Sequence, residues 1–275
     1  MRVQAQAHWE PKAGSQTSEY EDAFWLLNAA NNADVNADVF VDEFCCAIAD
    51  GATESSYSRI WAKQWVQAVC HKRLFNAEAM LTQLPQLQRQ WARYVQQRLQ
   101  RRSAALPWYV TEKAQQGAHA ALLSFNLQAG VGNGGAGWGT WQALAVGDCC
   151  LAQVRSGIAI ALFPYVAASE FNTRPYLLAS QPTNTDAKQL SAHIRTLMGE
   201  WHSGDHFYLM TDALAHWFYR SIEQGEMPWC AFDDLDSSAS DFLSFREWIQ
   251  VLRADGAIRN DDVTVMRIAV TGEDK

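Results

Sequence analysis

The sequence contains no long apolar segment. None of its apolar runs approaches the roughly 18 residues that a membrane-spanning helix needs. The opening stretch MRVQAQAHWEPKAGSQ has no apolar core of the kind found in a secretory signal. We therefore expect a cytoplasmic protein with no membrane partner.

Positive charge is also scarce. The 275 residues include 22 Lys and Arg against 30 Asp and Glu, a formal net charge of −8. Nucleic-acid binders usually carry a basic patch, so we expect no nucleic-acid partner. The basic stretch RLQRRS near residue 100 is better explained as the solvated C-terminal end of a helix. The acidic balance suits a protein that gathers carboxylates around cations.

Cysteine motifs are missing as well. The sequence has six cysteines but no C-x-x-C spacing, which argues against a cysteine zinc site. The adjacent pairs at 45–46 and 149–150 lie in strand-like runs, where neighbouring side chains point to opposite faces and cannot form a local disulfide. We expect reduced, buried cysteines and no cysteine nucleophile.

The glycine-rich stretch 130–139 is not a phosphate-binding loop. It lacks the Gly-Lys-Ser/Thr ending, and no helical pattern follows it. We interpret it as a flexible loop that leads into antiparallel strands. Residues 141–146 and 149–154 would then be paired strands, with Gly147-Asp148 at the turn between them.

The remaining segments alternate between strand and helix patterns. Strands are predicted at 22–29 and 43–49, with the Asn- and Asp-rich residues 31–38 as a hairpin turn. Helices are predicted from Ser55 onwards with a Ser55 or Ser56 cap, at 77–102 with Pro85 in a first turn or kink, and at 111–125.

The last third repeats the theme of a strand followed by a helix. One strand ends at Asp212 and precedes a helix. The next helix carries Phe242, Phe245, Ile249 and Leu252 on one face and ends near Gly256. Asp261-Asp262 begins a final strand that runs to Val270. Without a regular βαβ alternation, this order favours an α+β fold with antiparallel sheets.

Carboxylates recur at the ends of these strands. Asp50 and Asp212 each end a strand, and Asp261 begins one. If the ends converge on one rim, the carboxylates repel one another unless a divalent cation such as Mg²⁺ or Mn²⁺ binds them. Gly51 would let a metal approach the backbone. Each of Glu21, Asp148 and Asp262, taken singly, suits a cap or turn, whereas Asp50, Asp212 and Asp261 together favour a metal site.

Five motifs in this order resemble those of the metal-dependent type 2C protein serine/threonine phosphatases, in their divergent bacterial form. They are EYEDAF, AIADGA, AVGDCCLAQV, LMTDAL and DDVTVMRI, and they extend in register from about Ser18 to Val270. The resemblance implies a single domain over residues 1–275. It also implies a four-layer αββα sandwich in which helices flank two central antiparallel sheets.

The resemblance further implies a dinuclear Mn²⁺ or Mg²⁺ site at one end of the sandwich. Asp50 would bridge both metals, the Gly51 carbonyl would bind one, and Asp212 and Asp261 would complete the set of the second. Glu21 and Asp22 would hold metal-bound waters or ligate directly. Asp148 matches the aspartate of a third, weaker metal.

The implied activity is hydrolysis of phosphoserine and phosphothreonine by a hydroxide that bridges the two metals. Asp50, Asp212 and Asp261 would be catalytic through the water that they help to activate. No covalent phospho-enzyme is needed. The implied partners are a phosphorylated protein substrate and a partner serine/threonine kinase.

Four positions depart from the family pattern. Thr17 stands where many members have a phosphate-binding arginine, and Ala52 stands where animal-type members have a histidine. Ala213 and Asp262 replace the usual Gly and Asn of their motifs. Arg59 or another arginine is a candidate substitute, and His216 is more simply explained by packing.

Two alternatives to a phosphoprotein phosphatase stay open. The protein could be a weak or inactive pseudophosphatase that binds a phosphoprotein, which Thr17 and Ala52 would favour. It could also hydrolyse a small phosphorylated metabolite. The helical segment predicted at 77–125 is an ordinary flanking layer or a partner surface.

Overall fold

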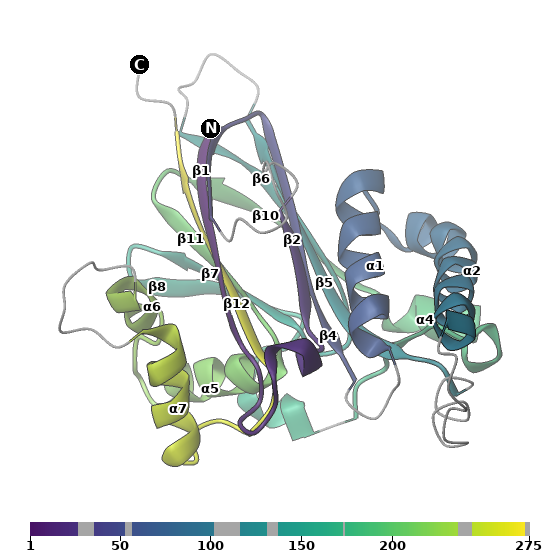
Figure 1. Ribbon diagram of the computed structural model, residues 1–275. Helices are drawn as coiled ribbons and strands as arrows, with labels where there is room; N and C mark the ends of the chain where they lie inside the picture. Colours follow the sequence, from purple (N-terminus) through teal and green to yellow (C-terminus); the bar gives the residue numbers. More distant parts are fainter. Residues whose placement is uncertain are drawn as a thin grey trace.

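The computed structural model describes residues 1–26, 36–52, 57–101, 116–130, 137–172, 174–235 and 244–272. Two antiparallel sheets form its centre (Figure 1). The first has the order β3 (Asn36–Phe40), β1 (Arg2–Glu10), β12 (Val263–Thr271), β11 (Asp205–Met210), β7 (Cys150–Arg155) and β8 (Ile158–Phe163). The second has the order β10 (Arg195–His202), β6 (Trp138–Val146), β5 (His119–Ala129), β4 (Glu43–Gly51) and β2 (Ala23–Leu26), and β9 (Leu178–Ala179) pairs with β5.

Helices cover the outer faces of both sheets (Figure 1). Beside the second sheet lie α1 (Ser58–Lys72), α2 (Ala77–Arg101) and α4 (Ala187–His193). Beside the first lie α5 (Asp212–Glu223), α6 (Cys230–Leu235) and α7 (Phe245–Ala254). Three short 3₁₀ helices, Thr17–Glu19, Ala168–Asn172 and Pro182–Asn184, lie in the connections. The predicted α+β fold and its four αββα layers are confirmed.

Three apolar cores separate the four layers. Strand β4 contributes to two of these cores, because its side chains alternate between its two faces. Cys45, Ala47 and Ala49 face the helices, where they pack with side chains of α1 and α2. The alternate residues Phe44, Cys46 and Ile48 face the first sheet. Because both faces of β4 are covered, its sequence is a continuous apolar run rather than an alternating one.

The predicted hairpin of 141–146 and 149–154 is wrong. The two strands exist as β6 and β7, but they belong to different sheets. Residues 147–149 cross from the second sheet to the first, with Gly147 at a φ of +96°. Two adjacent apolar strands do not reveal their partners, because each pairs with strands distant in sequence: β6 with β5 and β10, and β7 with β8 and β11.

The predicted helix at 111–125 is wrong for residues 119–125, although Gln116 is helical. Residues 119–129 form β5, which is buried at the centre of the second sheet. A short apolar run fits a buried strand and a buried helix equally well. The helical segment predicted at 77–125 therefore corresponds to α2, in which Pro85 lies beyond the first turn. Residues 111–115 lie outside the described part of the chain.

Several edge elements also differ from the predictions. The last three residues of the expected turn, 36–38, belong to strand β3 (Asn36–Phe40), which pairs with β1 rather than with β4. Strands β1 and β10 were not predicted. The alternation of buried Val3, Ala5 and Ala7 with polar residues was the available signal for β1. The proposed caps Ser55 and Ser56, and Phe242, fall outside the described residues.

No helix in the described ranges is both long and apolar enough to cross a membrane.

Replacing Trp61 tests how strongly α1 is anchored to the second sheet. Its side chain is fully buried, and its Nε1 donates a 2.7 Å hydrogen bond to the Leu178 carbonyl in β9. We expect Trp61→Ala to lower the free energy of unfolding by about 3–5 kcal/mol, measured by urea denaturation. Trp138→Ala is the matched control, because Trp138 is 42% exposed and should cost under about 1 kcal/mol. Equal losses would contradict the assigned core.

Candidate metal centre

Three aspartates converge where the two sheets meet. Asp50 lies near the end of β4, Asp148 lies in the crossover after β6, and Asp212 is the first residue of α5 after β11. One carboxylate oxygen of each lies within 4.8 Å of the others. The second sheet therefore contributes Asp50, the first contributes Asp212, and the connection between them contributes Asp148.

The three carboxyl groups share a buried, negatively charged environment. Burial raises the pKa of Asp50 well above its usual value, and Asp22, Asp212, Asp148 and Asp261 raise it further. Burial followed by Asp212 raises the pKa of Asp148 to about 7, although Arg259 acts against this rise. Without a bound cation, Asp50 and Asp148 hold protons near neutral pH.

Asp22 stands beside Asp50 and is almost fully buried. Its Oδ2 accepts a 2.6 Å hydrogen bond from the Thr264 hydroxyl, which also contacts the Tyr20 hydroxyl. Burial raises the pKa of Asp22 well above its usual value; the Thr264 hydrogen bond opposes this shift, and Asp262 and Asp212 add to it. The buried Oδ1 of Asp22 has no hydrogen-bond partner within the described residues.

The donor set suits a hard divalent cation. Asp212 also has a buried Oδ1 without a partner in the described part of the chain. A buried carboxylate oxygen without a donor is costly unless a cation compensates it. Carboxylates without histidine or thiolate suit Mg²⁺ or Mn²⁺ rather than zinc or copper. The residues at this rim therefore fit the metals that the sequence predicts.

Asp261 lies at the border of the group. It is partly buried, and its Oδ1 accepts the backbone N–H of Asp262 at 3.0 Å. Burial, with Asp212 next, raises the pKa of Asp261. The Asp261 carboxyl group is thus affected by some of the same charges as the central three. Its oxygens are not among those that lie within 4.8 Å of one another.

Glu21 is contacted by two residues outside the group of central carboxylates. The Ser58 hydroxyl donates a 2.6 Å hydrogen bond to its Oε1, and Lys12 Nζ lies 3.5 Å from its Oε2. Gly51 also contacts this segment. A Cβ at position 51 would lie 2.6 Å from the Glu21 carbonyl oxygen, so glycine is required here for backbone packing as well as for any approach of a ligand.

Asp262 has a structural role, which the sequence analysis gave as the alternative to metal binding. Its side chain is buried and accepts the backbone N–H groups of Lys12 at 2.8 Å and Glu21 at 2.6 Å. These two bonds fasten both ends of the 12–21 segment to the start of β12. The carboxylate expected beside the last metal-binding motif therefore positions the loop that carries Glu21 and Asp22.

Basic residues near the rim were harder to predict. Arg259 forms an ion pair with Asp212, and only its position two residues before Asp261 could have indicated this. Arg59 Nη1 lies 3.5 Å from the carbonyl oxygens of Thr17 and Ser18, close to the position of the missing arginine. His216 packs against Phe171 with ring centroids 5.5 Å apart, as the packing interpretation expected.

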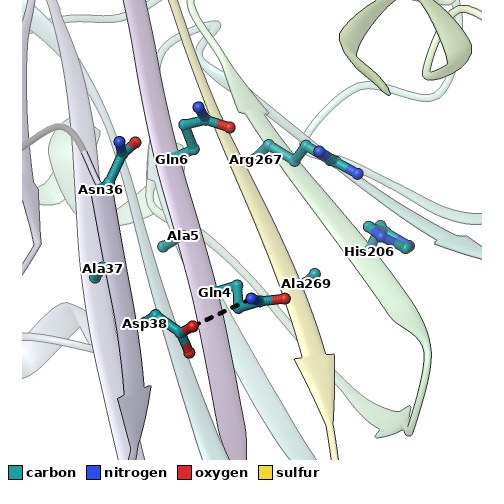
Figure 2. Close-up of a pocket in the computed structure, with 9 residues that line it drawn as sticks. All are labelled: Gln4, Ala5, Gln6, Asn36, Ala37, Asp38, His206, Arg267 and Ala269. Atoms are coloured by element: carbon teal, nitrogen blue, oxygen red, sulfur yellow. Dashed lines mark hydrogen bonds between the residues drawn. The ribbon is translucent and has the colours of Figure 1, made fainter. Parts of the chain in front are cut away.

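A groove on the outer face of the first sheet is separate from these residues. It has a volume of about 390 Å³ and is lined mainly by polar side chains of β3, β1, β12 and β11, including Gln4, Gln6, Asn36 and Arg267 (Figure 2). None of the carboxylates at the rim lines it. Its walls lie along the strands, whereas the candidate metal centre lies at strand ends.

Comparison with known families identifies the family to which the chain belongs. Residues 29–263 match the family model described as Protein phosphatase 2C. The chain belongs to the protein phosphatase 2C family. The expected resemblance is thereby confirmed, and with it a place among protein serine/threonine phosphatases. No match was found among curated protein sequences.

Solved protein phosphatase 2C structures share the fold at low sequence identity. The Mycobacterium tuberculosis serine/threonine phosphatase PstP/Ppp is 13% identical, with a TM-score of 0.54 over 98% of this chain and 100% of the other. The S. agalactiae serine/threonine phosphatase is 12% identical, with a TM-score of 0.55 over 98% and 99%. A PstP catalytic domain described in complex with two manganese ions is 14% identical, with a TM-score of 0.52 over 98% and 99%. The family's cofactors are thus Mn²⁺ or Mg²⁺.

Replacing Asp262 should loosen the 12–21 segment. Asp262→Ala leaves two backbone N–H groups without their charged acceptor, so we expect a loss of about 2–3 kcal/mol in the free energy of unfolding. Urea denaturation in chelator measures it. Asp261→Ala is the control, because among the described residues the Asp261 carboxylate accepts only its neighbour's amide, and its loss should change stability little. Equal losses in the two variants would contradict the fastening role.

Asp148 should make the metal-free protein less stable as pH rises. Its pKa is about 7 when folded and about 3.9 when unfolded, so the folded chain binds more protons between these values. Stability therefore falls as pH rises from about 4 to 7. In chelator at pH 8, Asp148→Asn should restore about 1–2 kcal/mol, seen as a higher Tm, and the gain should vanish near pH 4.

Asp38→Asn serves as the opposite control for the same measurement. Hydrogen bonds from Arg2 lower the pKa of Asp38 to about 2, so neutralising Asp38 should give no gain in Tm at pH 8. A Tm of Asp148→Asn equal to that of the wild type at pH 8 would show that Asp148 is not strained by its neighbours.

Proposed function

We propose that this protein phosphatase 2C member hydrolyses phosphoserine and phosphothreonine in proteins at a dinuclear Mn²⁺ or Mg²⁺ centre. The observation that carries the proposal is the convergence of Asp50, Asp148 and Asp212 within 4.8 Å. The buried, unpartnered oxygens of Asp22 and Asp212 within the described residues support it, because a cation would compensate them.

The proposed ligands divide into three groups. Asp50 lies between carboxylates of both sheets and would contact both metals, with the Gly51 carbonyl beside it. Asp212 and Asp261 would complete the second metal's ligands, and Asp148 would hold a third, weaker ion. Asp22 would ligate or hold metal-bound water, and so would Glu21, with Ser58 and Lys12 orienting its carboxylate.

Bound divalent cations supply positive charge for the phosphoryl oxygens and acidify water at neutral pH. The residues of the chain hold the acidic side chains in position. Thr264 holds Asp22 in place, and Asp262 holds the segment before it, so that the carboxylates stay fixed while charge changes beside them. The catalytic assignment of Asp50, Asp212 and Asp261 rests on this fixed arrangement.

The proposed partners are a phosphorylated protein and a serine/threonine kinase that produces it. A small phosphorylated metabolite is the alternative substrate, and rates on phosphopeptides and on such metabolites would distinguish the two. The chemistry at phosphorus is the same in both cases, so the metal centre alone does not select between them.

A binding-only pseudophosphatase is the second candidate. The observation that favours it is that Thr17 and Ala52 stand where family members have an arginine and a histidine, so neither position offers a guanidinium or an imidazole. Calorimetry that shows tight phosphopeptide binding without turnover would support this candidate.

Asp50→Asn tests the proposed function. We expect the wild type to hydrolyse p-nitrophenyl phosphate only with Mn²⁺ or Mg²⁺ and to lose activity in chelator. Asp50→Asn should lower the rate by about 100-fold or more, equivalent to roughly 3 kcal/mol of transition-state stabilisation. Asp38→Asn is the control, because this carboxylate lies in the groove away from the rim and should leave the rate unchanged. Full activity in Asp50→Asn would reject the proposed centre.

A further inference from the structure

Arg259 is a guanidinium placed at the mouth of the metal centre. It lies in the segment that leads into β12, and its Nη2 forms an ion pair with Asp212 Oδ2. The Arg259 side chain is 55% exposed, whereas the Asp212 side chain is 12% exposed. One end of the pair therefore belongs to the buried centre, and the other end faces solvent, from which a substrate arrives.

The charge of Arg259 reaches more than one carboxylate. It lowers the pKa of both Asp148 and Asp261, against the larger effect of burial on each. Within the described residues, only its Nη2 donates to a protein acceptor, so Nε and Nη1 remain available to a ligand. A guanidinium with two available donors matches the oxygens of a phosphate group.

Charge balance gives Arg259 a reason to contact substrate. The rim has five carboxyl groups whose oxygens or charges act on one another: Asp22, Asp50, Asp148, Asp212 and Asp261. A phosphate dianion that approaches these carboxylates is repelled by each one that is ionised. Arg259 offsets that repulsion at the exposed side of the site.

Arg59 is the competing cation. It lies on the first turn of α1, and its Nη1 makes 3.5 Å contacts to the carbonyl oxygens of Thr17 and Ser18. These contacts place it beside the position that lacks the family arginine. They do not bring it to a carboxylate of the described centre, whereas Arg259 is in direct contact with Asp212.

We propose that Arg259 binds the phosphate group of the substrate, exchanging Asp212 for the phosphate oxygens once divalent cations neutralise Asp212. This role rests on the proposed function, since it assigns the substrate's phosphate to the same centre. It makes Arg259 a catalytic residue that compensates for Thr17, from a different end of the chain.

Binding of inorganic phosphate to the Mn²⁺-loaded protein tests the proposal without turnover. Calorimetry is carried out on the wild type, Arg259→Gln, Arg259→Lys and Arg59→Gln, with Mn²⁺ binding measured separately for each. We expect Arg259→Gln to weaken phosphate binding by about 10- to 100-fold, because charge-assisted hydrogen bonds are lost. Arg259→Lys should recover part of the affinity. Arg59→Gln should change it by less than about twofold.

The Mn²⁺ titration separates a phosphate contact from a structural role. Arg259→Gln should bind Mn²⁺ as tightly as the wild type or more tightly, since Asp212 no longer has a competing cation. Weaker Mn²⁺ binding in Arg259→Gln would overturn the proposal. So would unchanged phosphate affinity, or a loss of phosphate binding in Arg59→Gln instead. A wild type that binds Mn²⁺ and phosphate through Arg259 but lacks turnover would refute only the hydrolytic function.

Discussion

Mutual repulsion among buried carboxylates is the constraint on which this structure depends. Asp22, Asp50, Asp148 and Asp212 come from four separate segments, and the other three all raise the pKa of Asp50. The surrounding contacts hold them there nevertheless. Thr264 orients Asp22, Asp262 fastens the 12–21 segment, and Gly51 lets the Glu21 backbone pack closely. The protein maintains a concentration of carboxyl groups whose repulsion divalent cations would relieve.

Sequence reasoning succeeded where a residue's role follows from its local neighbours. The apolar run that ends at Asp50 forms a buried strand, and the strand before Asp212 leads into a helix, as predicted. The acids at strand ends were identified because they interrupt apolar segments. Five ordered motifs then suggested the family that the family model confirms.

Sequence reasoning failed where the structure of a segment depends on partners that are distant in sequence. The crossover at residues 147–149 has the composition of a hairpin turn, and only the pairing of β6 with β5 and of β7 with β11 separates the sheets. β5 was interpreted as a helix because its burial on both faces removes the alternation. The contacts of Arg259 and Lys12 were out of reach for a similar reason, since each depends on an acidic partner that only the fold brings near.

The division of ligands between the sheets has a mechanical consequence. Asp50 belongs to one sheet and Asp212 follows a strand of the other, so a cation bound by both ties the two layers together at one end. The distance between the layers is set by the aromatic cluster of Phe125, Trp141 and Phe207, whose ring centroids lie 4.7–6.0 Å apart. A change in ring size within this cluster would therefore alter the separation of Asp50 and Asp212, and with it the fit of a cation between them.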